Sequence, residues 1–288
     1  MVEAPSRNNP ERVAVVTGAS SGIGLLTSIE LAKAKFHVIA SMRDITRRSR
    51  LDEAAKSAGV TDRIDIRALN VTNFEAMPEF VSQIIRDYKR IDVLINNAGF
   101  AVAGFIEDLA LEEIRSQLET NFFGHVAMTK AVLPFMRQQR SGHIIMLSSI
   151  GGLTASPTLS SYSASKFALE GWTEALRLEL NALGIKVVLV EPGSFQTDIW
   201  TRNAEIAKKA RDGSSPNRER GERMRDRVQN LHKKDPIVVA RAIAGIAQDA
   251  NPKLRYLVGN DARVQLWMKR VLPWKWHEKV IARVLKID

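Results

Sequence analysis

The chain has 288 residues, of which 45% are hydrophobic and 26% charged, so it can bury a large core and fits one large α/β domain better than two small ones. It contains no cysteine, which excludes disulfides, iron–sulfur clusters and thiolate zinc sites. Its net charge of +10 makes an anionic partner worth considering: nucleotide phosphate, nucleic acid or acidic lipid.

The N-terminal residues 1–12 are polar and include two prolines, and no segment approaches the ~20 apolar residues that span a bilayer. We therefore expect an unexported, cytoplasmic protein without a membrane span. The five histidines show no metal-ligand spacing, so we expect no metal site.

A short apolar run at residues 12–17 is typical of a strand buried in a parallel sheet, and a glycine-rich turn and a helical pattern follow it directly. This order cradles a phosphate, because glycines let the backbone approach and the helix N-terminus presents free N–H groups. The glycine spacing, G-x-x-x-G-x-G, departs from the common G-x-G-x-x-G. The turn residues predicted to bind the cofactor are Gly18, Ser20, Ser21, Gly22, Ile23 and Gly24.

The second apolar run, residues 36–40, should end beside the adenosine ribose, where an acidic residue would bind a free 2′-hydroxyl. Arg43 follows that run instead, and an arginine there can pair with a 2′-phosphate. We therefore expect NADP rather than NAD. Arg47, Arg48 and Arg50 are interpreted as the start of a solvated basic helix.

Strand-like and helical segments alternate through the rest of the chain. Further strands are predicted at residues 63–69, 91–95, 143–147, 185–190 and 254–258, and helices at 73–88, 111–140, from about 160, and at 238–250. This alternation predicts a single-domain α/β fold: a doubly wound, Rossmann-like parallel sheet of about seven strands, with helices on both faces and a C-terminal helical extension. Ligands of such sheets bind at the carboxyl ends of the strands. The strand-end residues expected there are Asn70, Val71, Asn97, Ala98 and Gly99.

Tyr162 and Lys166 are four residues apart, which puts them on one face of the predicted helix. A phenol has an unperturbed pKa near ~10, but a cation beside it favours the phenolate and lowers that pKa. A tyrosine tuned in this way exchanges a proton with a substrate oxygen. Taken alone, the pair fits a surface tyrosine and lysine of an amphipathic helix better, and only the other motifs decide between the two interpretations.

Several motifs in one order together resemble the short-chain dehydrogenase/reductase family. They are TGASSGIG at residues 17–24, NNAG at 96–99, Ser149, Tyr162 with Lys166, and Pro192 with Gly193. The resemblance covers roughly residues 12–200, and thirteen positions separate Ser149 from Tyr162, as in that family. Asn121 matches the family's fourth catalytic position. Asn70 departs from the aspartate that many members carry near the adenine, which weakens its assignment there but touches no catalytic group.

The resemblance implies hydride transfer to or from a nicotinamide cofactor. Tyr162 would donate a proton to a substrate carbonyl, or take one from an alcohol, while Lys166 would lower the pKa of Tyr162 and bind the nicotinamide ribose. Ser149 would hold the substrate oxygen, and Asn121 would position a water that relays protons to Lys166. The residues implied to meet the carboxamide end of the nicotinamide are Pro192, Gly193 and Thr197.

Residues 195–232 form a mobile lid in the family that this chain resembles, with Phe195, Ile199 and Trp200 placed to line it. Their charged stretch also fits a solvated helix, and we expect a lid whose outer face is that helix. These apolar residues, together with Phe100, favour a lipophilic substrate.

The C-terminal residues 261–288 combine an apolar, tryptophan-bearing face with basic residues. Such a tail could lie on an acidic membrane surface, which would make the protein peripheral to a membrane. The alternative is a helical flap packed on its own domain or on a neighbouring subunit, and we favour the flap.

The leading interpretation is a single domain, residues 1–288, that acts as an NADP(H)-dependent oxidoreductase on a lipophilic ketone, aldehyde or secondary alcohol, such as a steroid, a retinoid or a long-chain carbonyl. Family resemblance implies a homodimer or homotetramer. A nucleotide-sensing regulator with little turnover is the alternative, and the intact set of Asn121, Ser149, Tyr162 and Lys166 argues against it. We expect no nucleic-acid binding, because no helix-turn-helix, zinc finger or stacking platform is evident.

Overall fold

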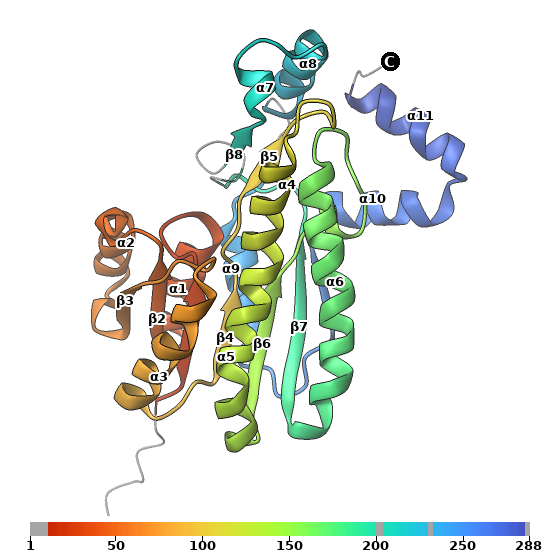
Figure 1. The fold of residues 1–288 in the computed structure, drawn as a ribbon. Helices are drawn as coiled ribbons and strands as arrows, with labels where there is room; N and C mark the ends of the chain where they lie inside the picture. Colours follow the sequence, from red (N-terminus) through yellow and green to blue (C-terminus); the bar gives the residue numbers. More distant parts are fainter. Residues whose placement is uncertain (1–10, 198, 200–203, 230–232, 286–288) are drawn as a thin grey trace, which may run out of the picture.

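A computed structural model describes residues 11–285 of the chain apart from 198, 200–203 and 230–232. At its centre lies a parallel sheet of seven strands in the order β3-β2-β1-β4-β6-β7-β9 (Figure 1). The strands are β1 (Val13–Thr17), β2 (His37–Met42), β3 (Ile64–Ala68), β4 (Val93–Asn96), β6 (Gly142–Leu147), β7 (Ile185–Pro192) and β9 (Arg255–Val258). The predicted doubly wound, Rossmann-like sheet of about seven strands is therefore confirmed. Strand order reverses between β1 and β4, and ligands of such sheets bind at that crevice.

Helices cover both faces of the sheet, which explains why its strands are continuously apolar. On one face lie α1 (Gly22–Lys33), α2 (Ser49–Ala58) and α9 (Ile237–Ile246), and on the other α3 (Met77–Tyr88), α5 (Gly124–Gln139) and α6 (Ser160–Leu180). Successive residues of β1 serve the two cores in turn: Val16 packs with the first group and Val15 with the second.

Three local features differ from the sequence-based prediction. The helix expected over residues 111–140 consists of α4 (Leu111–Leu118), a π-helical segment (Glu119–Phe123) and α5. Two further strands, β5 (Ala101–Ala103) and β8 (Ala204–Ile206), pair in parallel outside the main sheet. Each has three residues, which is too short for an alternating pattern to be recognised.

The chain leaves the sheet after β7 and returns at an adjacent point. Phe195 and Lys234 form an isolated β-bridge, with the Gln196 N–H donating to the Lys234 carbonyl at 2.8 Å. Between these points lie β8, α7 (Lys208–Arg211) and α8 (Arg218–Gln229). This excursion coincides with the region predicted as a lid.

The chain ends in two helices after β9. They are α10 (Asn260–Val271) and α11 (Trp274–Leu285), and α11 reaches α8 of the excursion (Figure 1). The predicted C-terminal helical extension is thus present. Across the described ranges, no helix is both long enough and apolar enough to cross a membrane.

Arg255 on strand β9 joins three carboxylates from two other elements. It pairs with Glu170 and Glu174 of α6 and with Glu191 of β7. Glu170 and Glu191 are 5% and 1% exposed, and the Ser148 hydroxyl also donates to Glu170. Burial, together with the negative charge of Glu170, raises the pKa of Glu191 to about 7, while Arg255 opposes that rise. This cluster holds α6, β7 and β9 together.

Replacing Arg255 with methionine should lower the free energy of unfolding by about 3 kcal/mol at pH 7, because two buried carboxylates lose their cation. We expect a smaller loss at pH 5. A carboxyl group whose pKa is higher in the folded than in the unfolded state binds protons on folding, so its contribution to stability rises in acid and is lost as pH rises. Urea unfolding at both pH values measures the difference.

The matched control for this variant is Arg86→Met, which removes an arginine from a surface pair with Glu79, 2.7 Å apart. Both side chains of that pair are well exposed, so the control should leave stability nearly unchanged at either pH. A loss for Arg255→Met that is equal at pH 5 and pH 7 would contradict the assignment of a buried carboxylate pair.

Candidate active site

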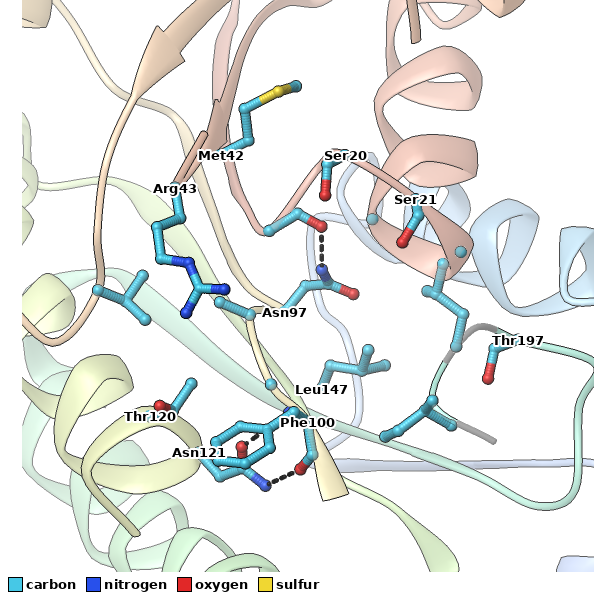
Figure 2. Close-up of a pocket in the computed structure, with 18 of the residues that line it drawn as sticks. Ser20, Ser21, Met42, Arg43, Asn97, Phe100, Thr120, Asn121, Leu147 and Thr197 are labelled. Atoms are coloured by element: carbon cyan, nitrogen blue, oxygen red, sulfur yellow. Dashed lines mark hydrogen bonds between the residues drawn. The ribbon is translucent and has the colours of Figure 1, made fainter. Parts of the chain in front are cut away.

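A cavity of about 520 Å³ lies at the carboxyl ends of the sheet strands, and Figure 2 shows part of its wall. Every residue predicted from the sequence to bind the cofactor or to act in catalysis lines it. These residues are Gly18, Ser20, Ser21, Gly22, Ile23, Gly24, Arg43, Asn70, Val71, Asn97, Ala98, Gly99, Asn121, Ser149, Tyr162, Lys166, Pro192, Gly193 and Thr197.

The glycine turn between β1 and α1 is held against the end of β4 by Asn97. The Asn97 side-chain amide donates to the carbonyls of Thr17 and Gly18 at 2.7 and 3.1 Å. Figure 2 shows Asn97 in the cavity wall with one dashed line from its amide. A Cβ at Gly24 would lie 2.4 Å from Asn97 Nδ2, and one at Gly18, where φ is 71°, would lie 2.8 Å from the Ala98 Cα. A side chain at either position would clash with Asn97 or Ala98. The two glycines therefore allow the turn to pack directly against the end of β4, with its backbone at the cavity wall.

Helix α1 begins at this turn with Ser21 as its N-cap residue. The Ser21 side chain makes no capping bond, and the first turn of α1 contains no acidic residue. Its N–H groups are therefore placed to bind a phosphate of a cofactor in the cavity.

Two arginines line the cavity near the end of β2. Figure 2 shows the Arg43 guanidinium pointing into the cavity, and Arg47 also belongs to its wall. The interpretation of Arg47 as part of a solvated helix is therefore incomplete, whereas Arg48 does pair at the surface with Asp52, 2.7 Å away. Asp44 lies between Arg43 and Arg47 in the chain. It accepts hydrogen bonds from the amide and hydroxyl of Thr46, and these bonds lower the pKa of its carboxyl. With Arg43 and Arg47 against Asp44, the net charge of these three residues of the cavity wall is positive.

The end of β3 forms a tight turn at the predicted adenine position. Asn70 Oδ1 accepts from the amide and hydroxyl of Thr72 at 3.2 and 3.0 Å. A Cβ at Gly124 would lie 2.9 Å from the Val71 carbonyl, so α5 begins in close contact with this turn.

Asn121 lies in the π-helical segment and is fully buried. Its amide donates to the Phe100 carbonyl at 3.0 Å and to Ser165 Oγ at 3.3 Å, and its oxygen accepts from the Phe100 N–H at 3.1 Å. π-Helical turns are frequent at functional sites. The side chain thus fixes the backbone that follows Gly99, and only its oxygen retains a free lone pair for a further ligand.

Ser149, Tyr162 and Lys166 meet where β6 ends and α6 begins. A Cβ at Gly151 would lie 3.0 Å from Tyr162 Cε1 and 3.4 Å from Ser149 Oγ, so both side chains face the same glycine. Lys166 Nζ donates to the Leu147 carbonyl at 2.7 Å and lies 5.8 Å from the centre of the Tyr162 ring. The helical spacing predicted from the sequence therefore places the two residues side by side.

The electrostatics of this group differ from the expectation that Lys166 lowers the pKa of Tyr162. Burial raises the pKa of the Tyr162 phenol above its ordinary value, with the Ser149 hydroxyl acting in the opposite direction. Burial also lowers the pKa of Lys166 to about 8, against the attraction of Glu170. Desolvation outweighs the hydrogen bond with Ser149, and the Lys166 ammonium is directed to the Leu147 carbonyl.

His125 bonds to Ala98 of the cavity wall, and no role was assigned to it from the sequence. It lies on α5, one turn beyond Asn121, and is 1% exposed. Its Nε2 lies 2.8 Å from the Ala98 carbonyl, which requires Nε2 to be the donor. Burial and the nearby Lys166 charge lower its pKa to about 3, so the ring is neutral. Its position four residues after Asn121, on the same face of a helix, is the one sequence signal that could have predicted its place.

The strand end predicted to meet the nicotinamide is clamped by the C-terminal tail. Asp261, in the first turn of α10, accepts from the Ser194 N–H at 2.6 Å, and a Cβ at Gly193 would lie 2.3 Å from its carboxylate. Lys234 lies 3.4 Å from the same carboxylate. Asp261 was not among the residues predicted for the site, because it is far from Pro192 and Gly193 in the chain.

A second cavity, about 610 Å³, opens on the other side of Tyr162. It shares Ser149, Tyr162 and Gly193 with the first cavity. Apolar side chains from the excursion and the C-terminal helices supply much of its wall: Ile206, Met224, Met268, Val280, Ile281, Val284 and Leu285. Phe195 and Ile199, predicted to line the substrate site, belong instead to the first cavity, and Trp200 lies outside the described residues.

Known proteins similar to this chain are oxidoreductases by name. An uncharacterized oxidoreductase of Bacillus subtilis, YusZ, is 40% identical over 278 residues, which are 96% of this chain and 99% of that protein. A 3-ketodihydrosphingosine reductase of Bacteroides thetaiotaomicron is 42% identical over 197 residues, 68% of each chain. Retinol dehydrogenase 8 of Homo sapiens is 35% identical over 255 residues, 85% of this chain and 80% of that protein.

Solved structures share the fold. A short-chain dehydrogenase from Streptomyces avermitilis has a TM-score of 0.79 at 33% identity, with 94% of this chain and 97% of that one covered. A metagenomic short-chain oxidoreductase in complex with NADP scores 0.68 at 25% identity, with 86% and 96% covered. A Burkholderia phymatum protein in complex with NAD scores 0.77 at 21% identity, with 90% and 93% covered, and that likeness concerns the fold alone.

A model of the short chain dehydrogenase family matches residues 12–207, a span that begins just before β1 and ends beyond β8. Because that span is more than half of the chain, and because YusZ matches nearly end to end, the chain belongs to the short-chain dehydrogenase/reductase family and is an oxidoreductase.

Proposed function

We propose that the protein is an NADP(H)-dependent oxidoreductase that transfers hydride between nicotinamide and the carbonyl or secondary alcohol of a lipophilic molecule. One observation carries this proposal. Ser149 and Tyr162 lie in the wall shared by the strand-end cavity and the more apolar second cavity. A cofactor in the first and a substrate in the second would meet at the Tyr162 phenol.

The strand-end cavity suits a dinucleotide phosphate. The turn at Gly18 and Gly24 leaves no room for a side chain, and the uncapped start of α1 offers N–H groups to the pyrophosphate. Arg43, with Arg47 beside it, would pair with a 2′-phosphate on the adenosine ribose. When bound, the nicotinamide supplies the hydride, and the protein supplies position and charge.

Tyr162 is the proton donor in this proposal. Because burial raises its pKa, the phenol keeps its proton at neutral pH and can release it to a carbonyl oxygen as the carbonyl carbon gains the hydride. The Ser149 hydroxyl would donate a hydrogen bond to the same oxygen and stabilise its developing negative charge. Alcohol oxidation runs the same steps in reverse and needs the phenolate.

Lys166 would restore the proton to Tyr162 and bind the nicotinamide ribose. With a pKa of about 8, it is an ammonium at neutral pH, held in place by the Leu147 carbonyl. That Asn121 positions a relay water stays a prediction, for which its oxygen retains one lone pair.

The second cavity favours a substrate with a long or bulky apolar body, such as a steroid, a retinoid or a long-chain carbonyl. Its methionine, isoleucine, valine and leucine side chains offer dispersion contacts, and its 610 Å³ is within the usual range for a small-molecule site. The names of two relatives, a ketodihydrosphingosine reductase and a retinol dehydrogenase, support this class.

We further propose that residues 195–232 act as a lid and residues 261–288 as a tail within one domain of residues 1–288. The bridge between Phe195 and Lys234 marks where the lid leaves and rejoins the body. Family resemblance supports a homodimer or homotetramer, which light scattering would distinguish. No specific observation favours the alternative of a nucleotide sensor.

Tyr162→Phe keeps the ring and removes the proton, so kcat for carbonyl reduction should fall by about 10²- to 10⁴-fold. NADPH binding, followed by cofactor fluorescence, should change little. The assay is NADPH consumption with a panel of steroids, retinoids, long-chain aldehydes and small ketones. Tyr88→Phe, a distant tyrosine that donates to Asp65, is the control. Activity of Tyr162→Phe within a few-fold of the parent would refute the mechanism.

Arg43→Ala should raise the KM for NADPH by about 10- to 100-fold, since charge-assisted hydrogen bonds to the 2′-phosphate are lost. The KM for NADH should stay within a few-fold, which steady-state kinetics with both cofactors would show. Arg48→Ala removes a nearby arginine that pairs with Asp52 instead, and should leave both values unchanged. Equal effects of Arg43→Ala on the two cofactors would contradict the assignment.

Carbonyl reduction should keep its rate up to about pH 8 and decline above it. Lys166, whose pKa is about 8, loses its proton as pH rises and can then no longer return one to Tyr162. Alcohol oxidation should rise over the same range, since the proton that Tyr162 takes from the alcohol passes to Lys166, which must be neutral to accept it. Both are measured as kcat at saturating cofactor between pH 6 and pH 10, with cofactor affinity checked at each pH. A reduction rate that increases through pH 8 would sink the proposed role of Lys166.

A further inference from the structure

The outer face of the C-terminal helices is unusually rich in exposed tryptophan. Trp267 on α10 is 60% exposed, and Trp274 and Trp276 at the start of α11 are each 62% exposed. Val264 and Val271 on α10 are also more than half exposed. In Figure 1 these helices form an elbow at the periphery of the molecule, beyond α6.

These exposed residues occupy one side of α10. Val264, Trp267 and Val271 are three and four residues apart, which aligns them along the helix. Ala262 is buried, and Gln265 and Met268 line the second cavity. Helix α10 thus has an inner face on the cavity and an opposite apolar face toward solvent.

Helix α11 is divided in the same way. His277 and Leu285 are buried, and with Ile281 they line the cavity. Trp276 lies outside, 5.6 Å from Lys279 Nζ in a cation–π contact. The residues that we call the elbow face are Arg263, Val264, Trp267, Arg270, Val271, Trp274, Lys275, Trp276, Lys279 and Arg283.

The charge of the elbow face is positive. Its five basic side chains are exposed, and within the described ranges none of them is in an ion pair. Of the two acidic residues in α10 and α11, Asp261 is engaged by Lys234 and Ser194, which leaves Glu278. Lys269 is not counted, because it donates to the Leu153 carbonyl.

Tryptophan mixed with lysine and arginine is the composition of a surface that meets lipid headgroups. The indole rings sit at the boundary of the acyl chains, while long basic side chains reach the phosphates. A second copy of this chain suits the face less well. A twofold contact would bring one set of five cations against the same set, and like charges across an interface are unfavourable.

We propose that the elbow face docks the protein onto the surface of a membrane that contains anionic lipid. Since the inner faces of α10 and α11 line the second cavity, docking would place that cavity about one helix diameter, ~10 Å, from the lipid. A lipophilic molecule could then pass between bilayer and cavity without crossing much water. Docking itself does not depend on the proposed reaction.

The test is co-sedimentation of the full chain, with NADPH, on vesicles of phosphatidylcholine alone or with 30% phosphatidylserine. We expect binding to the anionic vesicles that is about tenfold or more stronger than to the neutral ones and that weakens as salt is raised. Tyr162→Phe should bind like the parent, so a failed reaction and a failed docking can be told apart.

Two variants and their matched controls test the elbow face. Trp274→Ser/Trp276→Ser and Arg270→Glu/Lys275→Glu should each reduce binding to anionic vesicles by about tenfold or more. Phe74→Ser/Leu178→Ser removes exposed apolar residues elsewhere, and Lys56→Glu/Lys130→Glu makes the same charge change on α2 and α5. Both controls should bind like the parent.

Retained NADPH binding would show that each variant is folded, and light scattering would report its mass. Equal binding of all variants, or no binding by the parent, would overturn the proposal. So would a mass that falls only in the elbow variants without any vesicle binding, because it would identify the face as a contact between subunits.

Discussion

The hydrogen bond from Lys166 Nζ to the Leu147 carbonyl ties the helix that carries Tyr162 to the end of strand β6. A buried ammonium is costly unless it is bonded, and Lys166, which is 4% exposed, has this carbonyl and the nearby charge of Glu170. Ser149 follows Leu147 by two residues. The bond therefore sets the position of Tyr162 relative to Ser149, on which the proposed chemistry depends.

The same helix connects this group to the edge of the sheet. One turn beyond Lys166, Glu170 accepts from Ser148 and pairs with Arg255, which also reaches Glu191 at the end of β7. Glu191 is followed by Pro192 and Gly193, and Gly193 lies against Asp261 of the tail. The buried charges and the tail thus fix the position of Pro192 and Gly193, which are predicted to meet the nicotinamide. Cooperative polar networks of this kind favour one geometry.

The two cavities differ in what builds them. Strand ends and tight turns, with Arg43 and Asn97, line the first, whereas the second has apolar side chains from segments beyond the sheet. Sheet geometry constrains the first strongly, because a parallel register aligns all strand ends. The second depends on the excursion and the C-terminal helices, whose outer residues are free to serve a surface while their inner residues shape the cavity.

Sequence alone determined the sheet and the place of each motif, since apolar runs and helical periods are local and the carboxyl ends of parallel strands must meet at one edge. Every residue predicted to bind the cofactor or to act in catalysis does line the strand-end cavity. The pKa of Tyr162, the roles of His125 and Asp261, the wall position of Arg47 and the π-helical turn at Asn121 followed only from the tertiary structure. Each depends on burial or on a partner remote in the chain, which no local pattern contains.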